Sequence, residues 1–403
     1  MSVLTDNRLT RLFGSSESGE RTRAATWGRR ALLTLGVLVL VHLTYAFFAF
    51  SIFYGRDIQY PDTVFARFDE AAPPGGAGSA EGRPGREGAS GGGSGGAESG
   101  SGGPRSAAGE DSRRCEPSRT VGVQQELVRQ LVQQNFFVPA RPLYKLGFYG
   151  LVSFQATPWF DNKASEQIGI LDVVRRMAIE LTDALGRVRG TSLQNEALAD
   201  AQATLRVNER AWYVNNPLDE SVNTISPGAA ASYERAIQLY GDYNDQLSNC
   251  EAVFDTRSDN LRELLSRFTA TLGSTTTELA QRSRRYVYDP DLDRFVVGPG
   301  NNLGWFDFEA DNYFHRARGK MYALHGLLQA TRADFNDVLT DRNVLQVWDK
   351  MEVSIAEAAV MDPFIVSNGA ADSAIRPDHL GKMAEVILRA RASMVELRDI
   401  LAN

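Results

Sequence analysis

Apolar residues recur every three or four positions through most of the chain after residue 120, and this is the period of an amphipathic α-helix. The spacing predicts a series of helices separated by polar connections. One of them is expected to run from Leu193 to Trp212 and to stop at the Asn-Asn-Pro that follows. Another is expected to begin with Ser226 as its N-cap and Pro227 as its first helical residue.

Two later helices indicate how the elements end and pack. Leu261 begins an apolar stripe that reaches Leu272, and Gly273 is expected to end that helix through a left-handed residue, with a short helix after it. The final stripe is an a/d alternation at Leu380, Met383, Ile387, Ala390, Met394, Leu397 and Leu401. It favours packing against helices of the same chain, and a coiled coil with another protein is the alternative.

Residues 285–302 interrupt the helical pattern. Two short runs of β-branched and aromatic residues flank the sequence Asp-Pro-Asp-Leu-Asp, which is typical of an exposed β-hairpin. The expected fold class is therefore all-α: a multi-helix antiparallel bundle with a short β-hairpin insertion, preceded by one transmembrane helix and a disordered Gly-rich linker.

The transmembrane helix is expected at residues 31–54, which include no charged residue. At about 1.5 Å per residue they would extend roughly 36 Å as a helix, enough to cross a hydrocarbon core of about 30 Å. Arg21, Arg23, Arg29 and Arg30 precede the segment and favour a cytoplasmic N-terminus. A cleaved signal peptide is the alternative, although its apolar region is usually shorter and is followed by small residues.

Composition divides the rest of the chain. Of the 36 glycines, 15 fall between residues 71 and 110, and such a segment buries too little apolar surface to fold. The predicted order is a basic cytoplasmic tail at 1–30, the transmembrane helix at 31–54, a juxtamembrane segment at 55–70, a disordered linker at 71–113 and a helical domain at 114–403.

The formal charge of −7 argues against a nucleic-acid partner, because phosphate binding needs a basic face.

The two cysteines are Cys115, where the linker ends, and Cys250, deep in the helical domain. The predicted topology places both in an oxidising compartment, where a disulfide between them can persist. Two free thiols are an equal alternative.

The stretch "GWFDFEADNYFHRARG", residues 304–319, contains the candidate catalytic residues Asp307, Asp311 and His315. Asp311 and His315 are four positions apart and would share a helix face, with Asp307 one turn earlier on the same side. A catalytic or ligand site is compatible with this spacing. So is the acidic first turn of a buried helix that starts near Asp307, which the helix dipole favours. Bundle di-metal sites use Glu-x-x-His, which does not occur here, so no metal or other cofactor is expected.

A second polar stretch, residues 361–380, lies between strongly helical segments. Asn368, Asp372 and His379 are candidate ligand-binding residues within it. The alternative is a capped connection between two helices, which its Pro and Gly residues would explain. The predicted helical domain contains no nucleophile elbow and no phosphate-binding loop.

Four fragments carry a resemblance to a known family: "ERAWYVNNP" (209–217), "CEAVFDTRSDNLRELL" (250–265), "LGWFDFEADNYFHRARGKMYALHGLLQA" (303–330) and "MDPFIVSNG" (361–369). They resemble the domain-of-unknown-function family 2333, over roughly residues 120–403. The resemblance implies a single-span envelope protein of bacteria. From this and the arginines before residues 31–54, we expect an inner-membrane protein with its N-terminus in the cytoplasm and its helical domain in the periplasm. The resemblance implies no activity and no site residues.

The sequence therefore favours a non-enzymatic role, as an envelope scaffold or protein-interaction module. Its expected partners are the lipid bilayer, through residues 31–54, and another protein of the envelope. Two alternatives stay open. One is a metal-dependent or carboxylate-based hydrolase of an envelope substrate, centred on Asp307, Asp311 and His315. The other is a periplasmic ligand-binding sensor that uses the loop around Asn368.

Overall fold

The chain divides into two compact units, Met1–Ile58 and Gln59–Asn403. The computed structural model describes residues 27, 29–44, 115–135, 137–140, 161–187, 193–211, 228–283, 286–297, 307, 309–369, 373 and 375–402. In the second unit nearly all of the described regular structure is helical, and this confirms the predicted helical bundle.

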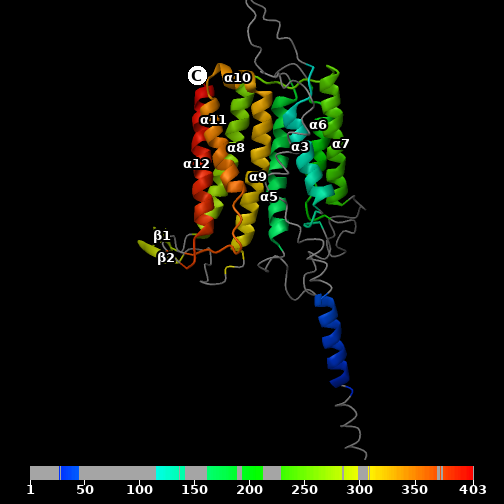
Figure 1. Ribbon diagram of the computed structural model, residues 1–403, viewed down its shortest axis with the longest axis vertical. Coiled ribbons are helices and arrows are strands. Elements are labelled where there is room, and N and C mark those ends of the chain that lie inside the picture. Colours follow the sequence, from blue (N-terminus) through cyan, green and yellow to red (C-terminus); the bar gives the residue numbers. More distant parts are fainter. Residues whose placement is uncertain are drawn as a thin grey trace, which may run out of the picture. The chain divides into compact units, whose positions relative to one another are not determined.

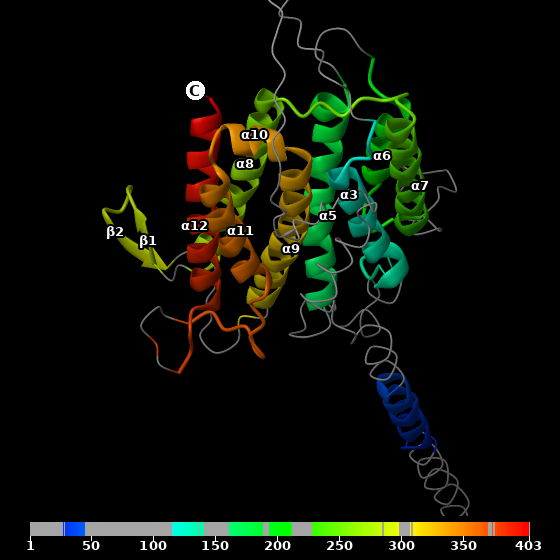
Figure 2. The ribbon, with the colours of Figure 1, turned by 45° about the horizontal axis from the view of Figure 1, so that its top comes forward.

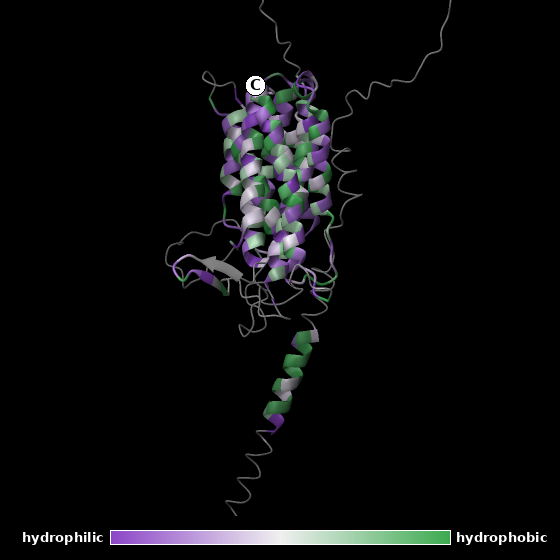
Figure 3. Ribbon diagram, turned by 90° about the vertical axis from the view of Figure 1, so that its left-hand side faces the viewer, coloured by the Kyte–Doolittle hydropathy of each residue, from purple (hydrophilic) through white to green (hydrophobic). Residues whose placement is uncertain are grey.

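In the first unit, residues 29–44 form a helix with exposed apolar side chains. Figure 3 shows that this helix is hydrophobic over most of its length, whereas hydrophobic and hydrophilic residues alternate along the helices of the bundle. The remainder of the predicted membrane span, residues 45–54, and the predicted linker at 71–113 lie outside the described residues. Within the described part of the chain, no helix combines the length and the apolar character that a membrane span requires.

The long helices of the second unit lie side by side with their axes roughly aligned, from α12 at one edge to α7 at the other (Figure 1). Short π-helical turns extend two of the helices at their C-terminal ends: η2 Gln130–Gln134 follows α3, and η4 Leu181–Leu185 follows α5. The α-helices are α3 Arg119–Arg129, α5 Asn162–Glu180, α6 Glu196–Leu205, α7 Ala229–Ser248, α8 Ser258–Ser283, α9 Ala310–Asp334, α10 Asn336–Asp341, α11 Leu345–Ala359 and α12 His379–Leu401.

The helix α9 is the centre of the bundle, because it packs against α5, α11, α3, α8 and α12. Its closest partner, α5, runs in the same direction, so both helices begin at the same end of the bundle (Figure 2). The order of the contacts shows this: Ser165 bonds to Asn312, and Asp172, two turns further along α5, bonds to Arg316, one turn further along α9. The expected antiparallel arrangement therefore holds between neighbours in sequence but not for the tightest pair.

Two glycines allow α5 and α9 to touch through their backbones. A Cβ atom on Gly169 would lie 2.1 Å from the carbonyl oxygen of Arg316, and one on Gly319 would lie 2.2 Å from that of Glu166. Real Cβ atoms do not approach backbone so closely, so each side of the contact requires glycine. Since the helices meet here at such short range, the residues just before the contact are also brought together.

The predicted apolar stripe of α12 is confirmed. All seven of its residues are buried, and α12 packs on α8 and α11 of the same chain. Interior packing between amphipathic helices therefore explains the a/d pattern without a second protein.

The prediction that Gly273 ends a helix is wrong, because α8 continues through it to Ser283. The backbone at Gly273 does not adopt a left-handed conformation. Its bare surface lies instead against α12, where a Cβ atom would come 3.2 Å from Nε of Arg391. The glycine thus makes room for an arginine of the neighbouring helix, and nothing in the local sequence distinguishes this use from a helix stop.

The helix predicted from Leu193 to Trp212 is shorter in the structure, where α6 spans Glu196–Leu205. Asn195 caps its start by accepting hydrogen bonds from the backbone of the first turn. At its end Arg175 of α5 donates to the carbonyl oxygens of Leu205 (2.8 Å) and Val207 (2.7 Å). These bonds replace those that a further helical turn would supply.

Two smaller elements complete the description. Strands β1 (Tyr286–Asp289) and β2 (Arg294–Val297) pair antiparallel across a tight turn, within the stretch where a β-hairpin was expected. The helix α7 begins at Ala229 after Gly228, while the expected cap residues Ser226 and Pro227 lie outside the described residues.

Cys115 and Cys250 form a disulfide, with their Cα atoms 5.0 Å apart. It joins the residues that precede α3 to the end of α7. The start of α3 is also held by Ser118, whose hydroxyl donates to Asp334 (2.7 Å) and whose backbone N–H donates to Asn244 (3.0 Å). The disulfide closes a sequence separation of 135 residues, so it restricts the unfolded chain more than it shapes the folded one.

Candidate functional site

The described residues of both predicted site groups lie at the end of the bundle where α5 and α9 begin. Asp307 precedes α9, and its carboxylate accepts a hydrogen bond of 2.8 Å from the side chain of Asn368, which belongs to the α11–α12 connection. The two polar stretches that the sequence singled out are therefore joined in space, although 61 positions separate these two residues.

Two buried carboxyl groups, those of Asp161 and Asp311, lie at this end of the bundle. Asp161 occupies the N-cap position of α5, and Asp311 lies in the first turn of α9. Burial, aided by the negative charge of Asp311, raises the pKa of Asp161 to about 8. Burial raises the pKa of Asp311 to about 7, with a smaller contribution from the charge of Asp307. Two parallel helix N-termini favour negative charge at this end, and desolvation outweighs them.

His315 lies one turn after Asp311 on α9 and is also buried. Burial lowers its pKa to about 4, and the positive charge of Arg318 acts in the same direction. The imidazole is therefore neutral at pH 7. Its Nδ1 has no hydrogen-bond partner among the described residues, and its ring lies edge-on to Phe314, with the ring centres 5.6 Å apart.

Asp307 does not join Asp311 and His315 on the helix, because α9 begins three residues later than expected, at Ala310. Its carboxylate is bound instead by Arg282, at the end of α8, and by the Asn368 amide. These bonds hold Asp307 in the approach to the helix rather than in its first turn. The prediction of a helix start at Asp307 is corrected accordingly.

In the second predicted group, His379 and Asn368 form hydrogen bonds with other parts of the chain. Nδ1 of His379 accepts a hydrogen bond of 2.9 Å from the backbone of Ser367, whose hydroxyl donates to the carbonyl oxygen of Pro377 (2.6 Å). Asn368 also donates to the carbonyl oxygen of Arg282 (3.0 Å). Asp372 lies outside the described residues. These contacts agree with the capped-connection interpretation of residues 361–380.

Sequence reasoning did not single out Arg318, which is central to this end of the bundle. Its buried guanidinium lies 2.6 Å from a carboxylate oxygen of Asp362 and 3.5 Å from one of Glu166. It therefore fastens the α11–α12 connection to α9 and α5. The only local signal was that α9 carries charged residues around its whole circumference, which is unusual for a helix with so few exposed positions.

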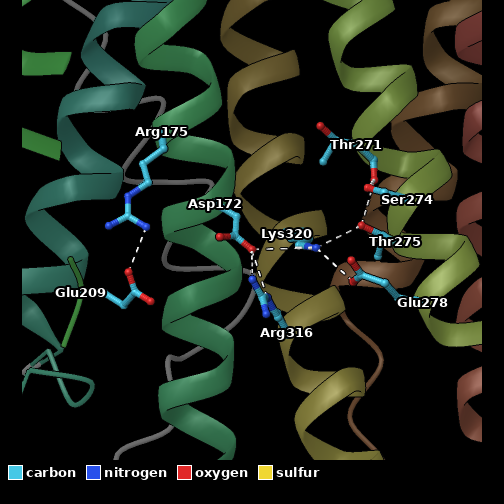
Figure 4. A network of polar contacts seen from close by, with 9 residues as sticks. All are labelled: Asp172, Arg175, Glu209, Thr271, Ser274, Thr275, Glu278, Arg316 and Lys320. Carbon is cyan, nitrogen blue, oxygen red and sulfur yellow. Dashed lines mark hydrogen bonds and ion pairs between the residues drawn. The ribbon is translucent and has the colours of Figure 1, made fainter. Parts of the chain in front are cut away.

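A second polar network lies further along the same helices, beyond the glycine contact (Figure 4). Lys320 of α9 is buried, and its Nζ lies 3.8 Å from Asp172 of α5, 3.5 Å from Glu278 and 3.4 Å from Thr275 of α8. Arg316 adds a hydrogen bond of 2.8 Å to Asp172. One buried ammonium group thus connects three helices. Removal of both carboxylate partners would leave a buried positive charge without compensation in a low-dielectric interior.

The arrangement is therefore suited to holding helices and a connection in place. Asp307, Arg318, Asn368 and His379 each bond to a different segment of the chain, while Asp311 and His315 are buried. Among the described residues, no group of three or more His, Cys, Asp and Glu side chains is placed to hold a metal ion.

Comparison with known proteins gives one family match. The profile of an uncharacterized protein family conserved in bacteria, DUF2333, matches residues 143–403. No curated protein and no solved structure matches the chain.

Proposed function

Because the chain belongs to DUF2333, an uncharacterized family conserved in bacteria, we propose its role from its own geometry: it is a membrane-anchored scaffold of the bacterial envelope. In this proposal residues 31–54 anchor the chain in the inner membrane with the N-terminus in the cytoplasm. Residues 71–113 form a flexible tether, and the bundle within 114–403 presents a binding surface in the periplasm.

The observation that carries the scaffold proposal is how the polar residues at the α5–α9 end are used. A hydrolase centred on Asp307, Asp311 and His315 would need these groups to face a common substrate. Asp307 is instead bound by Arg282 and Asn368, and the other two are buried. The polar groups therefore serve to fix the position of the α11–α12 connection on the bundle.

Two observations support the envelope location. The disulfide between Cys115 and Cys250 belongs in an oxidising compartment, and in bacteria that compartment lies outside the cytoplasm. The described part of the predicted anchor, residues 31–44, is helical and has exposed apolar side chains, as a segment in contact with lipid would be.

The location is tested by the state of the two thiols in cells, since Cys115 and Cys250 are the only cysteines of the chain. Cells are lysed in acid and labelled with a polyethylene glycol maleimide before or after reduction. We expect no gel shift before reduction and a double shift after it. A double shift without reduction would place the domain in a reducing compartment and overturn the location.

The scaffold role is tested by the size of the assembly in native membranes. Chemical cross-linking followed by native gels should show the chain in a species larger than one copy. The variants Asp311→Asn and His315→Gln should leave that species unchanged, because neither side chain is available at the surface. A chain that stays a single copy at every cross-linker concentration would refute the scaffold.

A further inference from the structure

The connection between α11 and α12 exposes three bulky apolar side chains. Phe364 is 97% exposed, Ile365 60% and Ile375 80%. Large apolar side chains gathered in one exposed segment mark a site of interaction, because their exposure to water carries a cost that binding removes.

This connection is held rigidly on both sides of Phe364. Before it, Asp362 is bound by Arg318 of α9. After it, Ser367 bonds to His379 and Pro377, and Asn368 forms a β-bridge with Asp378. These bonds reduce the conformational entropy that the residues around Phe364 would lose on binding, so Phe364 and Ile365 can contribute more to affinity.

Two ion pairs near the connection have the cation inside and the carboxylate outside. The side chain of Arg318 is 7% exposed and that of its partner Asp362 is 68% exposed. Arg282 and Glu309 repeat the arrangement, at 14% and 62%. Glu309 belongs to the same end of the bundle, because Arg282 also binds Asp307 and receives a hydrogen bond from Asn368. Asp362 and Glu309 therefore place two carboxylates on the solvent side of this end.

We propose that Phe364, Ile365 and Ile375, with the carboxylates of Asp362 and Glu309, form a docking surface for a protein that offers an apolar pocket rimmed by Lys or Arg. We call these five residues the Phe364 surface. The proposal rests on the scaffold function and names the chemistry of its partner. A protein is favoured over the bilayer, because the anionic lipids of a bacterial membrane repel exposed carboxylates, whereas a basic rim complements them.

The test measures the affinity of the full chain, in nonionic detergent, for a short amphipathic helical peptide made only of Leu and Lys. We expect Phe364→Ser and Ile375→Ser each to weaken binding by about tenfold, as loss of an apolar anchor does. Glu309→Gln should weaken it less and reduce its dependence on salt. The matched control is Val353→Ser, which removes an exposed apolar side chain from the middle of α11 and should change nothing.

Two further probes separate the alternatives. The same peptide with every Leu replaced by Ser keeps its charge, and its residual binding should be unaffected by Phe364→Ser. Vesicles of phosphatidylethanolamine and phosphatidylglycerol test a lipid surface, using the chain reconstituted in nanodiscs. Vesicle binding that Phe364→Ser abolishes would overturn the proposal in favour of membrane docking, and equal peptide affinities for Phe364→Ser and Val353→Ser would overturn it outright. Neither result depends on thiol state or assembly size, so the scaffold function would be judged separately.

Discussion

Replacement of Asp161 by Asn tests whether the buried carboxyl group at the start of α5 carries a proton in the folded protein. The side chain is fully buried, and Asn keeps its size while removing the ionisable group. If the carboxyl is protonated at neutral pH, the change to Asn removes no charge from the folded protein. The variant should instead become more stable than the wild type as the pH rises.

The expected size follows from the two pKa values of the group. Burial raises the pKa of Asp161 from 3.8 to about 8, so between these values the folded protein keeps a proton that the unfolded chain releases. The free energy of unfolding then falls by about 1.4 kcal/mol for each pH unit. The stabilisation is complete below about pH 4 and is lost as the pH rises through about 8. Between pH 5 and pH 7 the group removes about 3 kcal/mol.

Other groups change stability in the same pH range, so the measurement compares the variant with the wild type. Burial also raises the pKa of Asp311, Glu180, Asp334 and Glu352. These slopes are common to both proteins and cancel in the difference. Urea unfolding of the full chain in nonionic detergent, followed by circular dichroism at pH 5 and pH 7, gives that difference directly.

The control is Asp200→Asn, which makes the same chemical change at an exposed position of α6. Its effect on the free energy of unfolding should be the same at both pH values. For Asp161→Asn, the advantage over the wild type should grow by about 3 kcal/mol between them. A difference that does not change with pH would show that Asp161 is ionised in the folded protein, and would refute the description of this end of the bundle as desolvated.

Three further predictions concern stability and use the same urea assay. Gly169→Ala should lower the free energy of unfolding by at least about 2 kcal/mol, because its methyl group would meet the Arg316 carbonyl oxygen at 2.1 Å; an unchanged value would contradict the backbone contact. Gly273→Ala should raise it by about 0.5–1 kcal/mol, since the nearest atoms belong to a flexible arginine side chain, and destabilisation would mean that α8 needs glycine there. Cys250→Ser should lower it by about 4 kcal/mol, and a reducing agent should lower the wild type equally while leaving the variant unchanged.

The helices were predictable because the apolar residues that form one buried helix face recur at a fixed spacing within a short stretch of sequence. The seven apolar residues of α12 recur at the spacing of one helix face, and all seven are buried. The errors occurred where a residue of another helix decided the outcome. Gly273 lies within a continuous α8, beside Arg391 of α12, and Arg175 of α5 binds the carbonyl groups where α6 ends.

The candidate site was predictable in part for the same reason. The spacing of Asp311 and His315 places both on α9, and both are buried. Asp307 was expected on the same helix, but Arg282 and Asn368 hold it outside the first turn. No local pattern could indicate these partners, since one belongs to the end of α8 and the other follows α11.

The sequence by itself determined the periodicity of the helices, the presence of an uncharged segment and a Gly-rich segment before residue 114, and the positions of the polar stretches. These are properties of neighbouring residues, and the hydrophobic effect acts on them locally. Only the tertiary structure decided that α5 and α9 run parallel through Gly169 and Gly319, that Asp161 and Asp311 share a desolvated end, and that Arg318 binds Asp362. Each depends on the packing of segments about 45 to 150 positions apart in the chain, where the partner, and not the spacing, determines the role of a residue.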